Sequence, residues 1–191
     1  MRKLKLQMNL SLDGYVAGPS GEMDWLVWGW DDELKEYVSD LTDSVDTIIM
    51  GRKMAAGFVS HWENTVSNPG DPSHSFGKKM MDTPKVVFSK TVRESPWKNT
   101  RMANGDLAME IDLLKNQPGK GIIAYGGAGF VSSLITGGLI DELYLFINPV
   151  AIGRGLPIFS SRTDLKLVRT KAFDCGIALH LYEPVSKRAE G

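Results

Sequence analysis

The sequence predicts an α/β protein in which helices cover both faces of a mostly parallel central sheet. Three observations predict this fold class. Short apolar runs alternate with segments of helical periodicity, several of these runs are too uniformly apolar to have a solvent face, and strand candidates end in glycine. The 191 residues can bury a core without disulfides or a structural metal, and we expect one domain over residues 1–191.

The first two elements follow from side-chain spacing. Residues 4–12 alternate apolar and polar side chains, which predicts a strand with one buried face that ends at Asp13 and Gly14. A glycine-rich loop then leads through three tryptophans to a helix that begins near Asp31. Acidic residues at positions 31 and 32 suit the positive end of a helix dipole.

The remaining elements are shorter and more apolar. In chain order we predict a strand over residues 47–50, a helix from Gly51 that ends near Gly57, a long irregular loop over residues 59–77, a strand over 85–89, a helix over 104–115, a strand over 121–124, a helix over 126–135, a strand over 141–147, and strands over 165–173 and 177–183. The last two strands are predicted to pair as an antiparallel hairpin.

Composition excludes several classes of protein. The single cysteine, Cys175, cannot form an internal disulfide or a multi-cysteine metal site, and it suits a reducing compartment such as the cytoplasm. A net charge of −1 argues against a nucleic-acid partner. The N-terminus lacks the apolar core of a signal peptide. Residues 121–140 are uncharged and of membrane-spanning length, but their glycines fit a strand, turn and helix better, so no membrane partner is expected.

Three predicted strand ends carry residues that could meet phosphate groups. Parallel strands bind ligands at their carboxyl ends, where helices begin. The residues concerned are Gly51, Arg52 and Lys53, then Ser89, Lys90 and Thr91, and then Gly126, Gly127, Ala128 and Gly129. A cation beside an adenine ribose favours NADP over NAD. The alternative is that the glycines only form a tight turn and that the cations are ordinary surface residues.

Five motifs follow one another in a recognisable order: MNLSLDGYVAG, IIMGRK, KVVFSKT, AYGGAGFVSSLI and DELYLFINPVAIGRGLPIF. In this order the sequence resembles the dihydrofolate-reductase-like superfamily over residues 3–183. More specifically, it resembles the reductase domain of the bifunctional riboflavin-biosynthesis deaminase-reductase. The resemblance implies a standalone three-layer α/β/α reductase that uses NADPH to reduce a pyrimidine- or pterin-like heterocycle. One cysteine cannot supply the zinc ligands of the deaminase, so no metal is expected.

The resemblance also implies residue roles. The segment from Asn9 to Ala17 would pass the nicotinamide, with backbone groups of Val16 and Ala17 holding its carboxamide. The three strand ends would hold the cofactor phosphates, with Ser89 and Lys90 beside the 2′-phosphate and residues 126–129 at the pyrophosphate. Residues 153–157 match a loop that is typical of the riboflavin branch.

The substrate site is implied less directly. Asp13 and Glu33 are the proposed proton donors, either directly or through a water. Three tryptophans are candidate ring-stacking walls: Trp25, Trp28 and Trp30. A substrate with a ribose phosphate would need further cationic contacts, for which the candidates are His61, His74, Lys78 and Lys79.

Several alternatives stay open at this stage. The activity of a dihydrofolate reductase, a nucleotide-binding module without turnover and a flavin-dependent reductase are each compatible with the motifs. The apolar strands over residues 143–147 and 177–181 suggest a homodimer, although a monomer would use them as core. No motif makes Cys175 a catalytic thiol.

Overall fold

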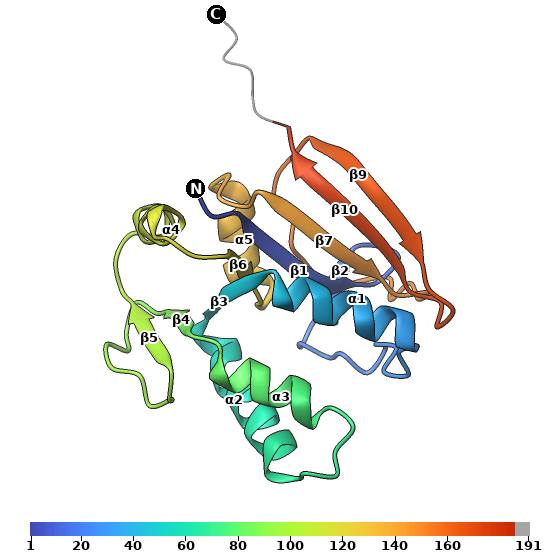
Figure 1. Ribbon diagram of the computed structural model, residues 1–191. Coiled ribbons are helices and arrows are strands. Elements are labelled where there is room, and N and C mark those ends of the chain that lie inside the picture. Colours follow the sequence, from blue (N-terminus) through green and yellow to red (C-terminus); the bar gives the residue numbers. More distant parts are fainter. Residues whose placement is uncertain (186–191) are drawn as a thin grey trace, which may run out of the picture.

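Eight strands form one sheet in the order β5-β4-β3-β6-β1-β7-β10-β9 in the computed structural model, which describes residues 1–185 (Figure 1). The strands are β1 (Leu4–Leu10), β3 (Val45–Gly51), β4 (Lys85–Phe88), β5 (Thr100–Ala103), β6 (Gly121–Ala124), β7 (Glu142–Ile147), β9 (Leu165–Ala172) and β10 (Ala178–Pro184). The strands from β5 to β7 are parallel, and β10 and β9 are antiparallel to their neighbours.

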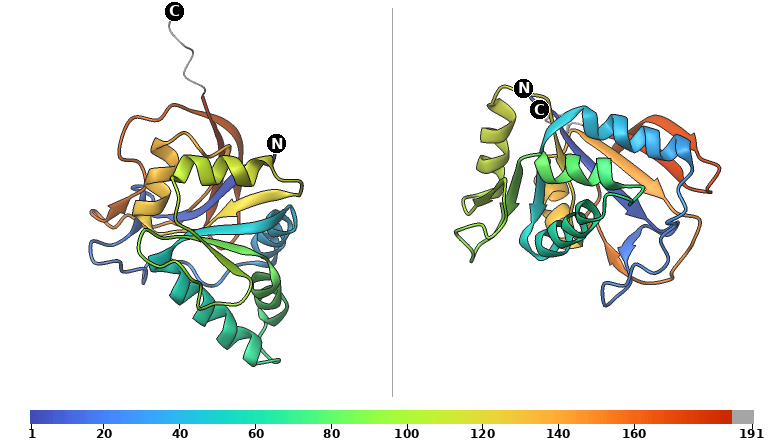
Figure 2. Two further views of the ribbon diagram at one scale, coloured as in Figure 1. Left: turned by 90° about the vertical axis from the view of Figure 1, so that its left-hand side faces the viewer. Right: turned by 60° about the horizontal axis from the view of Figure 1, so that its bottom comes forward.

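Five helices cover the two faces of this sheet. They are α1 (Asp32–Asp43), α2 (Arg52–Ser67), α3 (His74–Asp82), α4 (Leu107–Asn116) and α5 (Ala128–Thr136). Buried side chains of α1, α2 and α3 share one core, and those of α4 and α5 share another on the opposite face. Figure 2 shows α1 and α5 on opposite sides of the sheet. The predicted three-layer α/β/α fold with a mostly parallel sheet is confirmed.

The first strand differs from its prediction, because β1 is buried on both faces. It lies between β6 and β7 in the middle of the sheet, so its side chains are buried or half-buried. Its polar side chains instead find partners: Lys5 Nζ donates to Ser44 Oγ (2.7 Å), and Tyr125 Oη donates to Gln7 Oε1 (3.3 Å). The polar and apolar residues of β1 therefore face two different cores, one on each side of the sheet, rather than solvent and a single core.

The largest error concerns the region after Gly51. Helix α2 does not end at Gly57 but continues to Ser67, so it occupies the first part of the stretch predicted as irregular, and the first turn of α3 occupies its last four residues. Aromatic packing holds both helices, with ring centroids 6.2 Å apart for Phe58 and Trp62 and 5.4 Å apart for Trp62 and Phe76. This burial outweighs the cost of one helical glycine, which is about 1 kcal/mol.

Three short strands were not predicted. β5 extends the sheet beyond β4, while β2 (Tyr15–Ala17) and β8 (Leu156–Pro157) pair with each other outside it. The pairing of β2 with β8 brings the loop after β7 against the loop after β1. The glycine at position 155 approaches the carbonyl oxygen of Ala17 so closely that a Cβ there would collide with it.

The predicted C-terminal hairpin is confirmed as β9 and β10. Both strands on which the homodimer was argued, β7 and β10, lie inside the sheet, because β9 covers the outer edge of β10. They are core strands and give no argument for a dimer. Residues 121–140 form β6, a turn and α5, and no helix within residues 1–185 is long and apolar enough to cross a membrane.

Candidate functional site

The chain changes direction at the carboxyl ends of β3 and β6, which are neighbours in the sheet. From β3 it turns through α2 on one face towards β4, and from β6 it turns through α5 on the other face towards β7. Such a reversal opens a crevice at the carboxyl ends of the strands, where α/β proteins bind ligands. The glycine motifs at residues 51 and 126–129 both lie at this crevice.

Both helices that begin at the crevice have open N-termini. The N-cap residues are Gly51 for α2 and Gly127 for α5; in the described chain neither has a side-chain cap, and neither helix has an acidic residue in its first turn. The first backbone N–H groups of both helices therefore remain available to an acceptor. Together with the helix dipoles they provide an anion site.

One side chain fills part of the crevice, and the backbone beside it remains accessible. A Cβ added at Gly51 or Gly126 would come within 3.0 Å of Phe130, whose ring centroid lies 5.3 Å from that of Phe88. At Gly127 an added Cβ would meet nothing within 4 Å. Phe130 thus fills the gap between the two strand ends, and the backbone at the start of α5 is accessible to a ligand.

Three cations stand beside these helix starts. Arg52, Lys53 and Lys90 are exposed and form no ion pair within residues 1–185. Gly51 pairs in register with Phe88, so Arg52 and Lys90 lie just beyond adjacent strand ends. Positive charge in the first turn of a helix is unfavourable. A bound anion would relieve that repulsion, which makes phosphate the chemistry that best fits this corner.

The loop after β4 is ordered by hydrogen bonds to Ser89. Its hydroxyl oxygen accepts from the backbone N–H groups of Thr91 (3.2 Å) and Val92 (2.9 Å). Asn104, at the end of β5, donates from Nδ2 to the carbonyl oxygens of Ser89 (2.6 Å) and Val92 (2.8 Å). These bonds fix the backbone on either side of Lys90. The sequence predicts Asn104 as the start of a helix, but α4 begins at Leu107, and the contacts of Asn104 with the loop after β4 were missed because β5 was not predicted.

Asp13 acts as an anchor for the loop that follows β7. Its carboxylate accepts hydrogen bonds from Ser11 Oγ (2.7 Å), Gly153 N (2.7 Å) and Ile152 N (3.2 Å). The Ser11 hydroxyl bond, followed by the backbone bonds, keeps the pKa of Asp13 below its ordinary value. Gly153 has a φ of +76°, a conformation that favours glycine. The structure therefore places Asp13 as a charged hydrogen-bond acceptor.

Glu33 lies at the start of α1 and has a different partner. Its carboxylate pairs with Lys171 Nζ on β9 at 2.8 Å. The neighbouring Asp31 caps α1 by accepting from Leu34 N (2.8 Å) and also accepts from Cys175 N (2.9 Å) in the β9–β10 turn. Both acids therefore join α1 to the terminal hairpin, and Glu33 shares no partner with Asp13.

The three tryptophans occupy different environments in the loop before α1. Trp28 is 73% exposed. Trp30 is half-buried against the α1-side core and donates from Nε1 to the carbonyl oxygen of Val27 (2.8 Å). The indole N–H of Trp25 is enclosed and has no hydrogen-bond partner in the described part of the chain. Backbone groups of Val16 and Ala17 lie nearby in sequence on the buried strand β2.

The four further cation candidates do not gather at the crevice. Lys79 pairs with Asp43 and donates to the carbonyl oxygen of Ser39 (3.3 Å), beside the C-terminus of α1. Lys79 therefore has a structural partner, which agrees with the alternative that it is an ordinary surface residue and not a phosphate contact. His61 packs edge-on against the ring of Trp62, with centroids 4.6 Å apart. His74 and Lys78 lie on α3, where Lys78 is exposed.

A buried asparagine that the sequence analysis missed completes the site. Asn148 follows β7 and is fully buried. Its Oδ1 accepts from Val27 N (3.0 Å), which ties the tryptophan loop to the sheet, and its Nδ2 donates to Asn9 Oδ1 (3.3 Å). The only clue in the sequence was a polar residue directly after an apolar strand.

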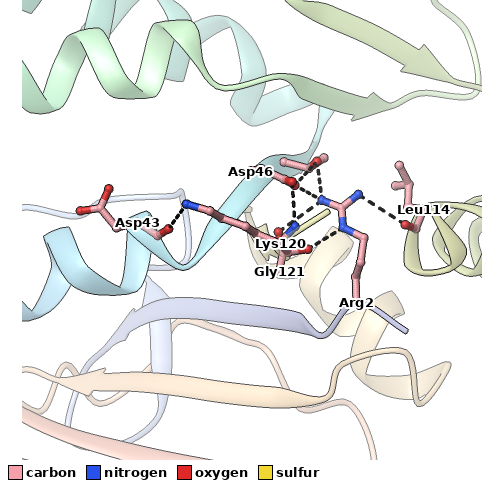
Figure 3. Close-up of polar contacts among 7 residues, drawn as sticks. Arg2, Asp43, Asp46, Leu114, Lys120 and Gly121 are labelled. Carbon is pink, nitrogen blue, oxygen red and sulfur yellow. Dashed lines mark hydrogen bonds and ion pairs between the residues drawn. The ribbon is translucent and has the colours of Figure 1, made fainter. Parts of the chain in front are cut away.

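The opposite, amino edge of the sheet is closed by side-chain hydrogen bonds (Figure 3). Arg2 donates to the carbonyl oxygen of Lys120 (2.6 Å), to Thr47 Oγ1 (2.7 Å) and to the carboxylate of Asp46. A hollow of about 670 Å³ lies beside this network, and five cationic residues are among those that line it: Arg2, Lys3, Lys5, Lys115 and Lys120. Helix C-termini end at this edge and favour cations, so the positive charge there has a structural origin.

Comparison with known proteins gives the relationships of the chain. Residues 2–179 match the RibD C-terminal domain family. The chain is 33% identical over 186 residues to the uncharacterized protein YyaP of Bacillus subtilis (strain 168), covering 95% of this chain and 94% of that protein.

Solved structures support the same fold. A Thermotoga maritima diaminohydroxyphosphoribosylaminopyrimidine deaminase/5-amino-6-(5-phosphoribosylamino)uracil reductase aligns with a TM-score of 0.67 at 18% identity, over 96% of this chain and 57% of that one. The riboflavin biosynthesis reductase Rib7 of Saccharomyces cerevisiae aligns with a TM-score of 0.66 at 14% identity, over 97% of this chain and 90% of that one. Because the family model matches residues 2–179 of the 191, the chain belongs to the RibD C-terminal domain family.

Proposed function

We propose that this protein is an NADPH-dependent reductase that transfers hydride to a pyrimidine- or pterin-like heterocycle. The observation that carries the proposal is the pair of uncapped helix N-termini at the β3–β6 crevice, beside three cations without ion-pair partners in residues 1–185. Bound NADPH would supply the hydride. The protein would supply binding, orientation and exclusion of water.

Each part of the cofactor has a candidate partner. The N–H groups at the start of α5, over residues 127–129, would receive the pyrophosphate, and the start of α2 with Arg52 and Lys53 would bind a neighbouring phosphate oxygen. Lys90, presented by the loop that Ser89 and Thr91 shape, would pair with the 2′-phosphate. Backbone groups of Val16 and Ala17 would hold the carboxamide.

The substrate class is proposed from the family and from the aromatic loop. The Thermotoga maritima relative is described as a 5-amino-6-(5-phosphoribosylamino)uracil reductase, and we place the substrate of this chain in the same chemical class. Trp25, Trp28 and Trp30 would provide stacking surface. Because the Asp13 carboxylate is held ionised and Glu33 is paired with Lys171, a water at the site is the better candidate for the proton donor.

Cofactor titration tests the proposal directly. NADPH added to the purified protein should quench tryptophan fluorescence in a saturable way and release heat in calorimetry, and NADH should bind more weakly because it lacks the 2′-phosphate. A Lys90→Gln variant should lose most of this preference. Absence of saturable NADPH binding to wild-type protein would end the proposal at its first step.

A second candidate function is an NADP-binding module without turnover. It is favoured by one observation: neither Asp13 nor Glu33 offers a free carboxyl group, since the first holds a loop and the second holds β9. The same contact of Glu33 argues against a folate reductase that binds its pteridine through that residue. Oxidation of NADPH in a screen of oxidised pterins and ribosylaminopyrimidines separates the two functions. Turnover with any of them favours the reductase, and binding without turnover favours the module.

A further inference from the structure

The side-chain amide of Asn148 has a fixed orientation. The backbone N–H of Val27 can only donate a hydrogen bond, so the atom of Asn148 that faces it is the oxygen. On the other side, Nδ2 faces the carbonyl oxygens of Phe146 (3.3 Å) and Leu10 (3.5 Å), which can only accept. A flipped amide would place like groups together at all three contacts, and this side chain is fully buried, so no water could compensate.

This orientation determines that of Asn9. Because Asn148 presents an N–H donor, Asn9 must face it with its own oxygen, as the 3.3 Å contact shows. The NH₂ group of Asn9 then points away from Asn148. It has no hydrogen-bond partner within residues 1–185, and it is not an enclosed atom. The site therefore presents a donor here, and the acceptor that would complete it is not part of the described chain.

The face of the sheet indicates which ligand this donor meets. Leu4, Leu6, Met8 and Leu10 belong to the core under α4 and α5, so Asn9 points to the opposite face. Its register partner Phe146 lies in the α1-side core, together with Trp30. Val16, which we place beside the nicotinamide, belongs to the α5-side core. The Asn9 side chain thus faces the tryptophan side, where the heterocycle is proposed to bind.

We propose that the Asn9 amide donates a hydrogen bond to an exocyclic oxygen of the heterocycle, and that Asn148 acts as the positioning residue that fixes this polarity. The substrate would then carry an oxo group, as in a lactam ring, rather than an amino group at that position. This inference rests on the proposed function, because it assumes that a heterocycle binds on the α1 side of β1. A site built to pair one hydrogen-bonding group discriminates against an analogue that cannot pair.

Two probes that differ at position 4 of the ring test the inference; the change from oxo to amino also removes the hydrogen from the adjacent ring nitrogen. Pterin carries an oxo group at position 4, and 2,4-diaminopteridine carries an amino group there. Wild-type protein should bind pterin more tightly by roughly tenfold, the ratio expected for one well-made hydrogen bond. Asn9→Asp keeps the shape and the acceptor towards Asn148 but replaces the outward donor by an acceptor. The preference between the two probes should reverse.

Asn148→Leu tests the positioning role without touching Asn9. It removes the N–H donor that fixes the Asn9 amide, so this amide can turn either way and the preference for pterin should shrink towards equal binding of the two probes. If Asn148 only stabilised the fold, the variant would bind both probes more weakly and by the same factor. Thermal melts identify any variant that fails to fold, in which case the Asn9→Asp ratio alone decides.

The outcomes separate this inference from the proposed function. The inference is supported if the wild type binds pterin more tightly than 2,4-diaminopteridine and Asn9→Asp reverses this order. An unchanged ratio in Asn9→Asp overturns it, and so does a loss of NADPH affinity with an unchanged ratio, which would place the Asn9 amide on the cofactor. Failure of the wild type to bind NADPH overturns the proposed function instead, while the probe ratio still reports on Asn9.

Discussion

The two edges of the sheet use their polar groups in opposite ways. At the amino edge the guanidinium of Arg2 donates to carbonyl oxygens, a hydroxyl and the carboxylate of Asp46, so strand starts and a helix end are joined by satisfied hydrogen bonds (Figure 3). At the carboxyl edge α2 and α5 begin without side-chain caps in the described chain, and neighbouring cations have no ion pairs there. One edge is complete within the described chain, and the other is the edge at which we propose that a ligand binds.

The open helix starts are a property of the sequence and not of the fold. Helices α1 and α4 carry aspartate caps: Asp31 accepts from Leu34 N, and Asp106 accepts from the N–H groups of Ala108 (3.0 Å) and Met109 (3.1 Å). The helices at the β3–β6 crevice have glycine in the same position. Helix α3 also begins without a side-chain hydrogen bond at its N-cap, Ser73, so the feature that distinguishes the two crevice helices is a glycine in the capping position.

The largest expected effect breaks the closed edge. Arg2→Met should lower the free energy of unfolding by about 3 kcal/mol, because it removes the donor to the carbonyl oxygen of Lys120 and to Thr47 Oγ1 and leaves the Asp46 carboxylate without its cation. Urea denaturation measures this loss. Lys166→Met removes an exposed cation on β9 and should change stability by less than about 0.5 kcal/mol. If the two variants are equally stable, the amino edge does not stabilise the fold.

The next prediction converts an open helix start into a closed one. Gly127 has φ −75° and ψ 163°, close to the values at the capping residue Asp106, so Gly127→Asp should be accommodated. We expect a gain in unfolding free energy of about 0.5 kcal/mol from capping. NADPH affinity should fall about 100-fold, because a carboxylate would stand where the pyrophosphate binds.

Gly127→Asn is the matched control for that variant. It caps the helix without adding charge, so it should stabilise the protein similarly and weaken NADPH binding less than the aspartate does. Calorimetry and thermal melts on both variants separate the two effects. Retention of wild-type NADPH affinity by Gly127→Asp would show that the start of α5 does not face the cofactor.

A smaller effect is expected at the start of α2. Arg52→Gln should weaken NADPH binding about tenfold, the loss of one charge-assisted contact. It should also stabilise the free protein by roughly 0.5 kcal/mol, because a cation is removed from the positive end of the helix. Lys78→Gln, which removes an exposed cation on α3, should do neither. A destabilised Arg52→Gln would mean that Arg52 has a structural partner.

Prediction from the sequence was most accurate where local pattern decides. The β6 strand and the glycine turn that follows it were predicted correctly, because an apolar run and a glycine cluster are each contained in a few residues. Gly57 misled the prediction, since the packing of Phe58 and Trp62 on α3 is not visible in the residues around it. Local propensity predicts that the helix ends near Gly57, whereas packing of its aromatic side chains extends α2 to Ser67.

The same limit explains what was missed in the candidate site. The role of Asn148 depends on Val27 and Asn9, which lie more than a hundred positions away in the chain. Asp13 and Glu33 were chosen as acids near the expected substrate, but their partners, Gly153 and Lys171, come from distant loops and strands. Residue type indicated which side chains could act as acids or hydrogen-bonding groups. Their actual roles depend on contacts with residues far away in the chain.

The smallest expected effect concerns pH and returns to the amino edge. Lys85 is buried at the start of β4 and donates from Nζ to the carbonyl oxygens of Met81 (2.9 Å) and Thr83 (2.8 Å), and burial lowers its pKa to about 8. Between pH 8 and the unfolded value of 10.5 the unfolded chain binds the extra proton, so stability must rise with pH. The rise from pH 8 to 9 should be about 1 kcal/mol.

Urea denaturation of wild type and Lys85→Met over this interval measures it, since the variant lacks the titrating group and should show a flatter profile. Equal pH profiles would show that Lys85 keeps its proton in the folded protein over this interval.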